Sequence, residues 1–249
     1  HEQTIIIKTY FGVDTIFIKD EKFRNLFSNF IVIKDVEFAT RQAKLFHIDS
    51  IIGDDDDVEG DELYERINNY PLEDEVNSMI LLPYVDHTAG LSFQIVATGM
   101  LEDKNLTVYE RGDDFTTLTN CRYSSVKETE FEYLDNLNLS GDIDIESYKN
   151  QAMEIFGLYN DDEKLFKLRK LELLDELREP EYPDDIFVGF FKKGFGGEGM
   201  WVRCEDFENT DFYGILLNQP NQDLGVNIGD DVRVALIRYE DGEVAAFAV

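Results

Sequence analysis

Short apolar runs that alternate with turn residues dominate the chain, and this pattern predicts more strand than helix. In the N-terminal part, strand-like runs lie at 4–11, 13–19, 30–34, 79–85, 91–100 and 105–110. Turn signals separate the last three, so we expect a meander of three strands there. The stretch 36–52 fits both the helical and the strand period, and 126–134 alternates between charged and mixed positions.

Four segments carry a helical pattern instead. A short helix is expected at 20–27, a second at 61–69 with acids in its first turn, and a third from Ile145 to a glycine C-cap at Gly157. The fourth, 160–177, has Asn160 to cap it and Glu163 at the capping-box position. We expect its leucines to form one core-facing stripe. They are Leu165, Leu168, Leu171, Leu174 and Leu177.

Two prolines, Pro180 and Pro183, stop this fourth helix and mark the clearest boundary in the sequence. Beyond them we expect five short strands, at 186–193, 200–204, 212–217, 232–239 and 244–249. Such closely spaced short strands predict a small, mostly antiparallel, barrel-like sheet. The sequence therefore predicts an α+β fold, with a mixed α+β domain over 1–179 and a β domain over 184–249.

The chain is strongly acidic: its 249 residues include 53 Asp and Glu against 23 Lys and Arg, which gives a net charge of −30. This charge disfavours direct binding to nucleic acid or to an anionic membrane surface. A disordered acidic tail is also excluded, because 43% of the residues are hydrophobic and 13% are aromatic. The charge is spread evenly, with one denser run at 53–62. It suits a basic protein partner that associates by electrostatic steering.

Cysteine usage and the lack of targeting patterns favour a cytoplasmic protein. Cys121 and Cys204 are the only cysteines and have no metal-type spacing, so we expect free thiols in a reducing compartment. The sequence shows no signal-peptide pattern at its start, and no apolar run approaches the roughly 20 residues of a membrane-spanning helix. We therefore expect no membrane association, and the oligomeric state stays open.

Three motifs resemble catalytic or ligand sites but lack essential parts. The glycine loop 194–199 has the G-x-G-x-x-G spacing, yet a strand rather than a helix follows it, so we expect a hairpin connection. The acidic run lacks the final acid of a calcium loop, because Arg66 occupies that position. His87 lies at a turn and could act as a base oriented by a carboxylate, but no nucleophile motif accompanies it. We expect no catalytic residue, no metal and no cofactor.

Three blocks in the C-terminal region carry a family resemblance: E-G-M-W-V at 198–202, G-I-L-L-N-Q-P at 214–220 and G-D-D-V at 229–232. Residues 184–249 thereby resemble the YegJ-like family of uncharacterised bacterial proteins, which has E-H-M-W-V, G-x-L-x-N-x-P and G-D-x-V in this order. The resemblance implies a compact β domain and a bacterial origin, but no established reaction. Gly199 stands where the family has histidine, and the family's closing Asp-Trp pair is not visible near 239–242, so the departures count against catalysis.

Two hypotheses about function follow from these observations. The first is a non-enzymatic acidic protein that binds a basic protein partner, for instance an immunity or antitoxin-like protein that offers carboxylates to a basic nuclease. The second is a small-ligand-binding protein or enzyme with a pocket near Trp201 and the 194–199 loop. We favour interaction over catalysis, although Trp201 could also be the core aromatic of the small domain. The candidate binding residues are Glu198, Met200, Trp201, Asn218 and Pro220.

Overall fold

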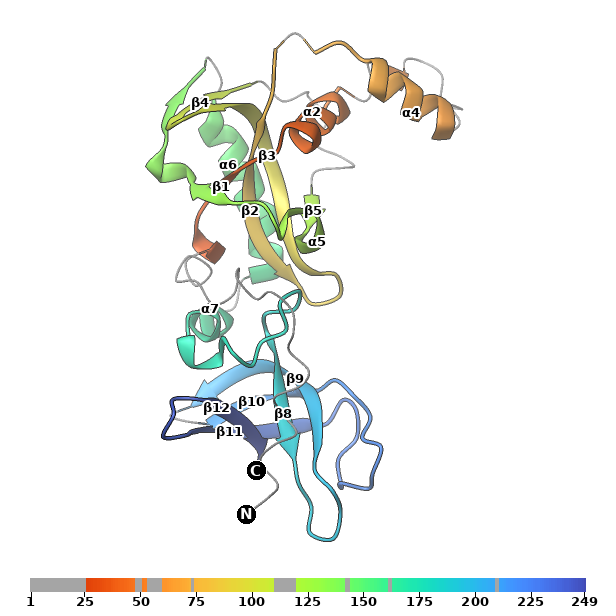
Figure 1. Ribbon diagram of the computed structural model, residues 1–249, viewed down its shortest axis with the longest axis vertical. Coiled ribbons are helices and arrows are strands. Elements are labelled where there is room, and N and C mark those ends of the chain that lie inside the picture. The colour runs from red at the N-terminus through yellow and green to blue at the C-terminus, as the bar shows by residue number, and fades with distance from the viewer. Residues whose placement is uncertain are drawn as a thin grey trace.

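The computed structural model describes residues 26–47, 51–52, 60–72, 74–109, 120–141, 144–160, 163–208 and 211–249. The strands expected at 4–11 and 13–19, most of the helix expected at 20–27 and most of the acidic run lie outside the described residues. The described chain forms an α+β structure with two separate sheets, as expected. The first sheet and its helices occupy one end of an elongated molecule, and a small barrel occupies the other (Figure 1).

The first sheet contains seven strands and has the order β6-β1-β2-β3-β4-β7, with β5 paired to the early part of β3. The expected three-strand meander is confirmed, because β2, β3 and β4 follow one another and pair antiparallel. The strands are β1 (Ile31–Lys34), β2 (Ser78–Asp86), β3 (Gly90–Glu102), β4 (Asn105–Val108), β5 (Asn120–Arg122), β6 (Phe131–Tyr133) and β7 (Asn138–Ser140).

Helices cover both faces of this sheet. On one face α2 (Val36–Leu45) contributes Ala39 to the core, and on the other α6 (Ile145–Asn160) contributes Ala152 and Phe156. Because both faces are covered, β2 is apolar along nearly its whole length and buried at eight successive positions. The remaining helices are α4 (Gly60–Asn69), α5 (Tyr123–Val126), α7 (Glu163–Arg169) and the 3₁₀ turns η2 (Leu26–Ser28), η3 (Leu134–Asn136) and η4 (Glu172–Leu174).

The ambiguous stretch 36–52 starts as a helix, since the Asp35 side chain caps α2 by accepting a hydrogen bond from the Phe38 amide at 2.9 Å. The helix expected from Ile145 is confirmed, but it continues through Gly157 to Asn160. The stretch 126–134 is mostly not a strand, because α5 ends at Val126 and β6 covers only Phe131–Tyr133.

The single helix predicted over 160–177 is wrong. Asn160 ends α6 instead of capping a new helix, α7 stops at Arg169, and the chain then winds through η4. The leucine spacing explains the error, because a strict repeat of three drifts by about 60° per step around an α-helix and matches the three residues per turn of a 3₁₀ helix. Amide-to-carbonyl bonds three residues apart indeed follow α7, at Leu171, Leu174 and Leu177.

The second sheet is the closed barrel expected for the C-terminal region. Its order is β10-β11-β12-β8-β9, and every neighbouring pair is antiparallel except β12 and β8, which pair in parallel at Phe247 and Gly189. One parallel pair is unavoidable when five strands that alternate in direction close into a barrel. The strands are β8 (Asp185–Phe190), β9 (Glu198–Glu208), β10 (Asp211–Leu216), β11 (Asp231–Arg238) and β12 (Val244–Ala248).

Leucine side chains that precede Pro180 in the sequence contribute to the barrel core. Leu168, Leu174 and Leu177 are buried and pack in the same cluster as Ile186 and Val202 of the barrel. The leucine stripe is therefore core, as expected, but it packs against the barrel rather than the first sheet. The exact domain boundary between 179 and 184 stays a prediction.

A buried ion pair joins the two sheets. The guanidinium of Arg169, at the end of α7, donates from Nε and Nη2 to the two carboxylate oxygens of Asp184 at 2.8 and 2.7 Å. Both side chains are at most 2% exposed. Arg169 also lies 5.0 Å from the ring centroid of Phe27, in the core of the first sheet. His87, in the β2–β3 turn, completes the cluster with Nε2 2.8 Å from Asp184 Oδ2.

The backbone reinforces this junction. The Leu91 amide at the start of β3 donates to the Glu181 carbonyl at 2.6 Å. Gly90 has a φ of +82°, and a Cβ placed there would lie 2.6 Å from that same carbonyl oxygen, so the hairpin approaches this closely only with glycine. The segment that the prolines mark as a boundary is thus a docking site for the β2–β3 hairpin.

We expect Asp184→Asn to destabilise the protein by about 3–5 kcal/mol, because it leaves the Arg169 guanidinium buried without its counter-charge. Chemical denaturation followed by far-ultraviolet circular dichroism measures this loss. Asp223→Asn is the matched control, since the Asp223 carboxylate pairs with Lys192 but is 81% exposed, and it should change stability by less than about 1 kcal/mol. Equal effects of the two substitutions would contradict a stabilising role for the buried pair.

Stability should also depend on the ionisation of Asp184 in acid. Burial alone would raise the pKa of its carboxyl, but the hydrogen bonds and charge of Arg169 and the contact with His87 outweigh burial and hold that pKa well below its usual range. Stability from this group is complete above the unfolded pKa of about 4 and is lost as the pH falls further. The stability gap between wild type and Asp184→Asn should narrow from pH 5 to pH 2, whereas parallel curves would exclude this linkage.

Candidate binding surface on the barrel

Trp201 lies on the outer face of β9, half-buried against its cross-strand neighbour Phe187. The two rings meet edge to face, with centroids 5.2 Å apart. The next residues on either side, Met200 and Val202, point into the barrel and are at most 3% exposed. Trp201 is therefore not the core aromatic of the barrel but part of its outer surface.

Asn218 lies beside Trp201, where β10 has just ended. Its side-chain oxygen accepts a hydrogen bond from the Trp201 amide at 2.8 Å, and the Leu217 amide donates to the Trp201 carbonyl at 2.9 Å. The asparagine side chain thus supplies one more hydrogen bond to the β9–β10 ladder beyond the end of the strand. It holds Trp201 in place, and its oxygen is already engaged by the protein's own backbone.

Glu198 fixes the polar turn that follows Asn218. Its carboxylate accepts hydrogen bonds from the Asn221 amide at 2.9 Å and from the Gln222 amide at 2.7 Å. The hydrogen bond from the Asn221 amide has the largest effect, and together with the one from Gln222 it lowers the pKa of the Glu198 carboxyl. The start of β9 and the turn 218–222 are therefore brought together, as their grouping in the sequence predicted.

The other two candidate residues do not belong to this surface. Met200 is 3% exposed and lies in the barrel core, and Pro220 is buried within its turn. The place of Met200 follows from strand alternation, since Met200 precedes an outward residue of β9 and must point inward. Whether Glu198, Trp201 and Asn218 bind anything stays a prediction.

A Cβ at Gly199, the position of the family's histidine, would collide with the ring of Phe187, whose Cζ lies only 2.1 Å from it. The aromatic ring therefore occupies the space that a side chain at 199 would need. The glycine loop itself joins β8 to β9 as a hairpin connection, as expected, and leads into no helix.

Two further aromatic residues extend this surface and were missed from the sequence. Phe191, just after β8, is 65% exposed, and its ring lies 5.7 Å from that of Phe247 on the outer face of β12. Gly189 lies between the two ring pairs, opposite Gly199. We call Phe187, Phe191, Trp201 and Phe247 together the aromatic strip. The alternation of β8 and β12 could have placed these rings outward, but only barrel closure puts β12 beside β8.

His87 has the carboxylate neighbour that the sequence suggested, but that carboxylate also serves the buried ion pair. Its Nε2 faces Asp184, whose two oxygens already accept from Arg169. The thiols are no better as nucleophiles, because burial raises the pKa of Cys121 and of Cys204 to about 12. Within the described ranges, no cluster of three or more His, Cys, Asp or Glu side chains could hold a metal ion. No helix in the described part could span a membrane.

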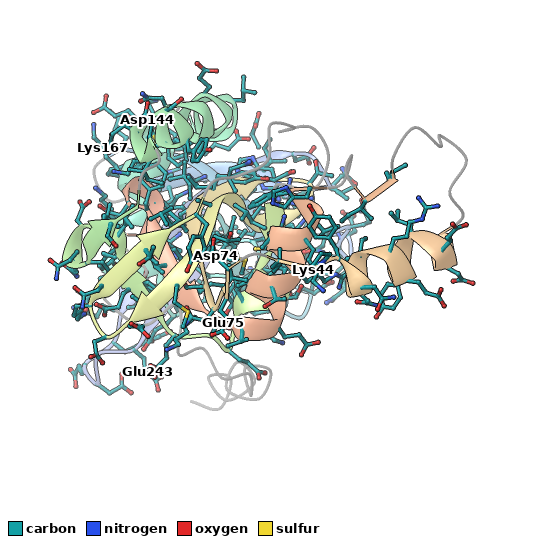
Figure 2. The ribbon with its side chains drawn as sticks, turned by 90° about the horizontal axis from the view of Figure 1, so that it is seen from above. Lys44, Asp74, Glu75, Asp144, Lys167 and Glu243 are labelled. Atoms are coloured by element: carbon teal, nitrogen blue, oxygen red, sulfur yellow. The ribbon has the colours of Figure 1, made fainter. Side chains whose placement is uncertain are left out.

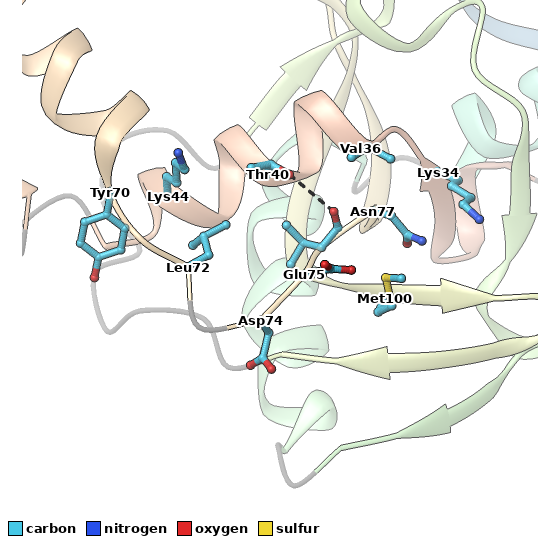
Figure 3. A pocket seen from close by; sticks show the side chains of 11 residues that line it. Lys34, Val36, Thr40, Lys44, Tyr70, Leu72, Asp74, Glu75, Asn77 and Met100 are labelled. Atoms are coloured by element: carbon cyan, nitrogen blue, oxygen red, sulfur yellow. Dashed lines mark hydrogen bonds between the residues drawn. The ribbon is translucent and has the colours of Figure 1, made fainter.

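A groove of about 640 Å³ lies elsewhere, between α2 and residues 70, 72 and 74–77, which precede β2 (Figure 3). Its polar side chains mainly serve the fold: Lys44 Nζ donates to the Asn68 carbonyl at 2.6 Å, and Asn77 exchanges two hydrogen bonds with the Leu101 backbone. Lys34 Nζ likewise donates to the Leu101 carbonyl. The groove contains none of the residues predicted from the sequence, and the engaged polar groups argue for a structural role.

Searches against family models, curated proteins and solved structures gave no match. The resemblance of 184–249 to the YegJ-like family therefore stays a prediction. The barrel has the compact β form that the resemblance implies.

We expect Gly199→Ala to displace the Phe187 ring, to destabilise the barrel by about 1–3 kcal/mol and to shift Trp201 fluorescence to longer wavelength. Gly196→Ala is the control within the same loop, because its Cβ would lie 3.5 Å from Gln222 Nε2, an ordinary contact. Thermal unfolding and emission spectra of the two variants test this directly. Identical spectra and melting temperatures would mean that Phe187 does not lie against Gly199.

Proposed function

We propose that this chain is a non-catalytic acidic protein that binds a basic protein partner through the barrel. The observation that carries the proposal is an acidic end of the barrel. There the β9–β10 hairpin and the β11–β12 turn lie toward the same end, because β10 and β11 are antiparallel and Asp211 at the start of β10 pairs with Ala235, beyond the midpoint of β11. We call the acids of the adjoining strand ends and of the β11–β12 turn the acidic end: Glu205, Asp206, Glu208, Asp211, Glu240, Asp241 and Glu243.

The described cations beside these acids include Lys164, Arg233 and Arg238, which is exposed at the end of β11, and they offset only part of the charge. Asp206 pairs with Lys164 at 2.5 Å and Asp211 with Arg233 at 2.5 Å. Glu205, Glu208 and Glu240 are exposed and form no ion pair with another described residue. In the free protein only water and salt surround these three carboxylates. A cationic surface that approaches them therefore gains favourable interactions without having to break existing ion pairs.

The rest of the molecule adds a long-range field of the same sign. Acidic side chains project at opposite edges of the molecule, as Asp144 and Glu243 show in Figure 2. A net charge of −30 accelerates encounter with a basic protein and opposes encounter with another acidic one. An inhibitor of a basic nuclease is one form that this function could take, because carboxylates can occupy the places of phosphates.

Charge reversal tests the proposal. The triple variant Glu205→Lys, Glu208→Lys, Glu240→Lys changes the net charge from −30 to −24, since each substitution adds two charges. The control variant Asp61→Lys, Glu65→Lys, Glu154→Lys reaches the same net charge with exposed acids of α4 and α6. Capture from a lysate of the source cells, in about 50 mM and about 500 mM salt, compares them with the wild type.

We expect the wild type and the control to retain a basic protein in low salt and to release it in high salt. The acidic-end variant should retain at least about tenfold less, because it reverses the local charge that the partner meets. Two results contradict the proposal: no basic protein retained by the wild type in low salt, or equal losses in both triple variants.

A further inference from the structure

The aromatic strip continues as an apolar surface toward the acidic end. On the outer face of β12, Phe247 is preceded at an interval of two residues by Ala245 and then, just before the strand begins, by Glu243. Strand pairing sets Ala235 of β11 beside Phe247, and Ile237 beside Ala245. From Phe247 to Glu243 is only about 13 Å along the strand, so one partner surface can cover both the strip and the acids.

Much of this surface is exposed. Phe191 is 65% and Ile237 47% exposed, and the rings of Phe187, Trp201 and Phe247 are half-buried. Among the described elements, β11 and β12 contact mainly each other, β10 and β8, which are their hydrogen-bonded neighbours in the barrel. No described helix covers the outer faces of these two strands. Contiguous exposed apolar surface next to polar residues is typical of protein-binding sites, and aromatic residues dominate binding energy there.

Charge decides which kind of partner fits. A second copy of the chain would bring another −30 to the interface, whereas a cationic protein would reduce the repulsion. Two of the cations beside the strip repel such a partner only weakly, because Lys192 pairs with Asp223 and Arg203 pairs with Asp185. Lys192 Nζ also lies 5.1 Å from the ring centroid of Phe195, so a ring at this edge already accommodates a cation.

We propose that the partner docks on the aromatic strip with a segment that presents arginine and apolar side chains, while the acidic end attracts it. Guanidinium groups stack on ring faces, and their aliphatic stems cover apolar surface, which lysine does less well. This inference rests on the proposed function, and it adds which surface anchors the partner and which side chains the partner supplies.

Trp201 allows a direct test, since it is the only tryptophan in the chain. A fluorescein-labelled synthetic peptide of alternating arginine and leucine serves as the probe, and a lysine–leucine peptide and a glutamate–leucine peptide serve for comparison. Anisotropy of the label reports binding to any part of the protein. In parallel, unlabelled peptide is titrated while Trp201 emission and its quenching by acrylamide are recorded, which reports binding at the strip.

Phe191→Ala removes the most exposed ring of the strip and leaves the barrel core intact. Tyr64→Ala is the control, because Tyr64 is a similarly exposed aromatic residue, 58% against 65%, on α4. We expect the arginine peptide to change Trp201 emission, to protect Trp201 from acrylamide and to bind more tightly than the lysine peptide. Phe191→Ala should weaken binding about tenfold, mainly through faster dissociation, and Tyr64→Ala should leave it unchanged.

Three outcomes would overturn the inference in distinguishable ways. If the arginine peptide binds but Trp201 emission and the affinity of Phe191→Ala stay unchanged, the strip is not the anchor and the proposed function still stands. If the protein is a dimer by light scattering and Phe191→Ala makes it monomeric, a second copy covers the strip. If neither a cationic peptide nor a basic protein binds in low salt, the proposed function fails and the inference fails with it.

Discussion

The arrangement of the whole molecule depends on the need to neutralise one buried guanidinium. Arg169 is fully buried, and a charge in that position is tolerable only beside a counter-charge with matching hydrogen bonds. Asp184 supplies both oxygens, so the end of α7 and the start of β8 must lie together. Phe27, which packs in the core of the first sheet, contacts Arg169, and His87 in the β2–β3 turn contacts Asp184, so the pair also fixes the sheet against the barrel.

This junction determines what the barrel can offer to a partner. The leucines that lead from Arg169 toward β8 enter the barrel core on the side of the first sheet, and the β2–β3 hairpin docks on the segment just before β8. Among the described elements no helix covers β11 and β12, which carry Phe247 and Ile237, whereas β9 also contacts α7. The aromatic strip is therefore separate from the junction, and substitutions in the strip should leave the junction intact. The acidic end touches the junction at one point, because Asp206 pairs with Lys164 of α7.

The local pattern of apolar and turn residues predicted most of the helices and strands. The predictions failed where tertiary packing determines the conformation of the chain. Strands β2–β4 and β8–β12 were predictable because short apolar runs between turn residues carry this information locally. The helix over 160–177 failed because a leucine repeat of three, which suits the 3₁₀ turns after α7, also resembles an α-helical stripe. The pairing of buried Arg169 with Asp184 is a tertiary contact that the local pattern does not show. Trp201, Glu198 and Asn218 were correctly grouped, since their blocks flank one hairpin and one turn. Phe191 and Phe247 were missed, because they become neighbours only through the parallel pairing that closes the barrel.

The evenly spread charge and the aromatic strip contribute to different steps of partner recognition. A net charge of −30 attracts every cation, so by itself it raises encounter rates without distinguishing one basic protein from another. Discrimination requires contacts that depend on shape, and the rigid rings held by Gly199, Asn218 and the paired strands supply such contacts at little entropic cost. Because water is displaced from the rings only when a complementary surface covers them, charge should govern how fast complexes form and the strip how long they last.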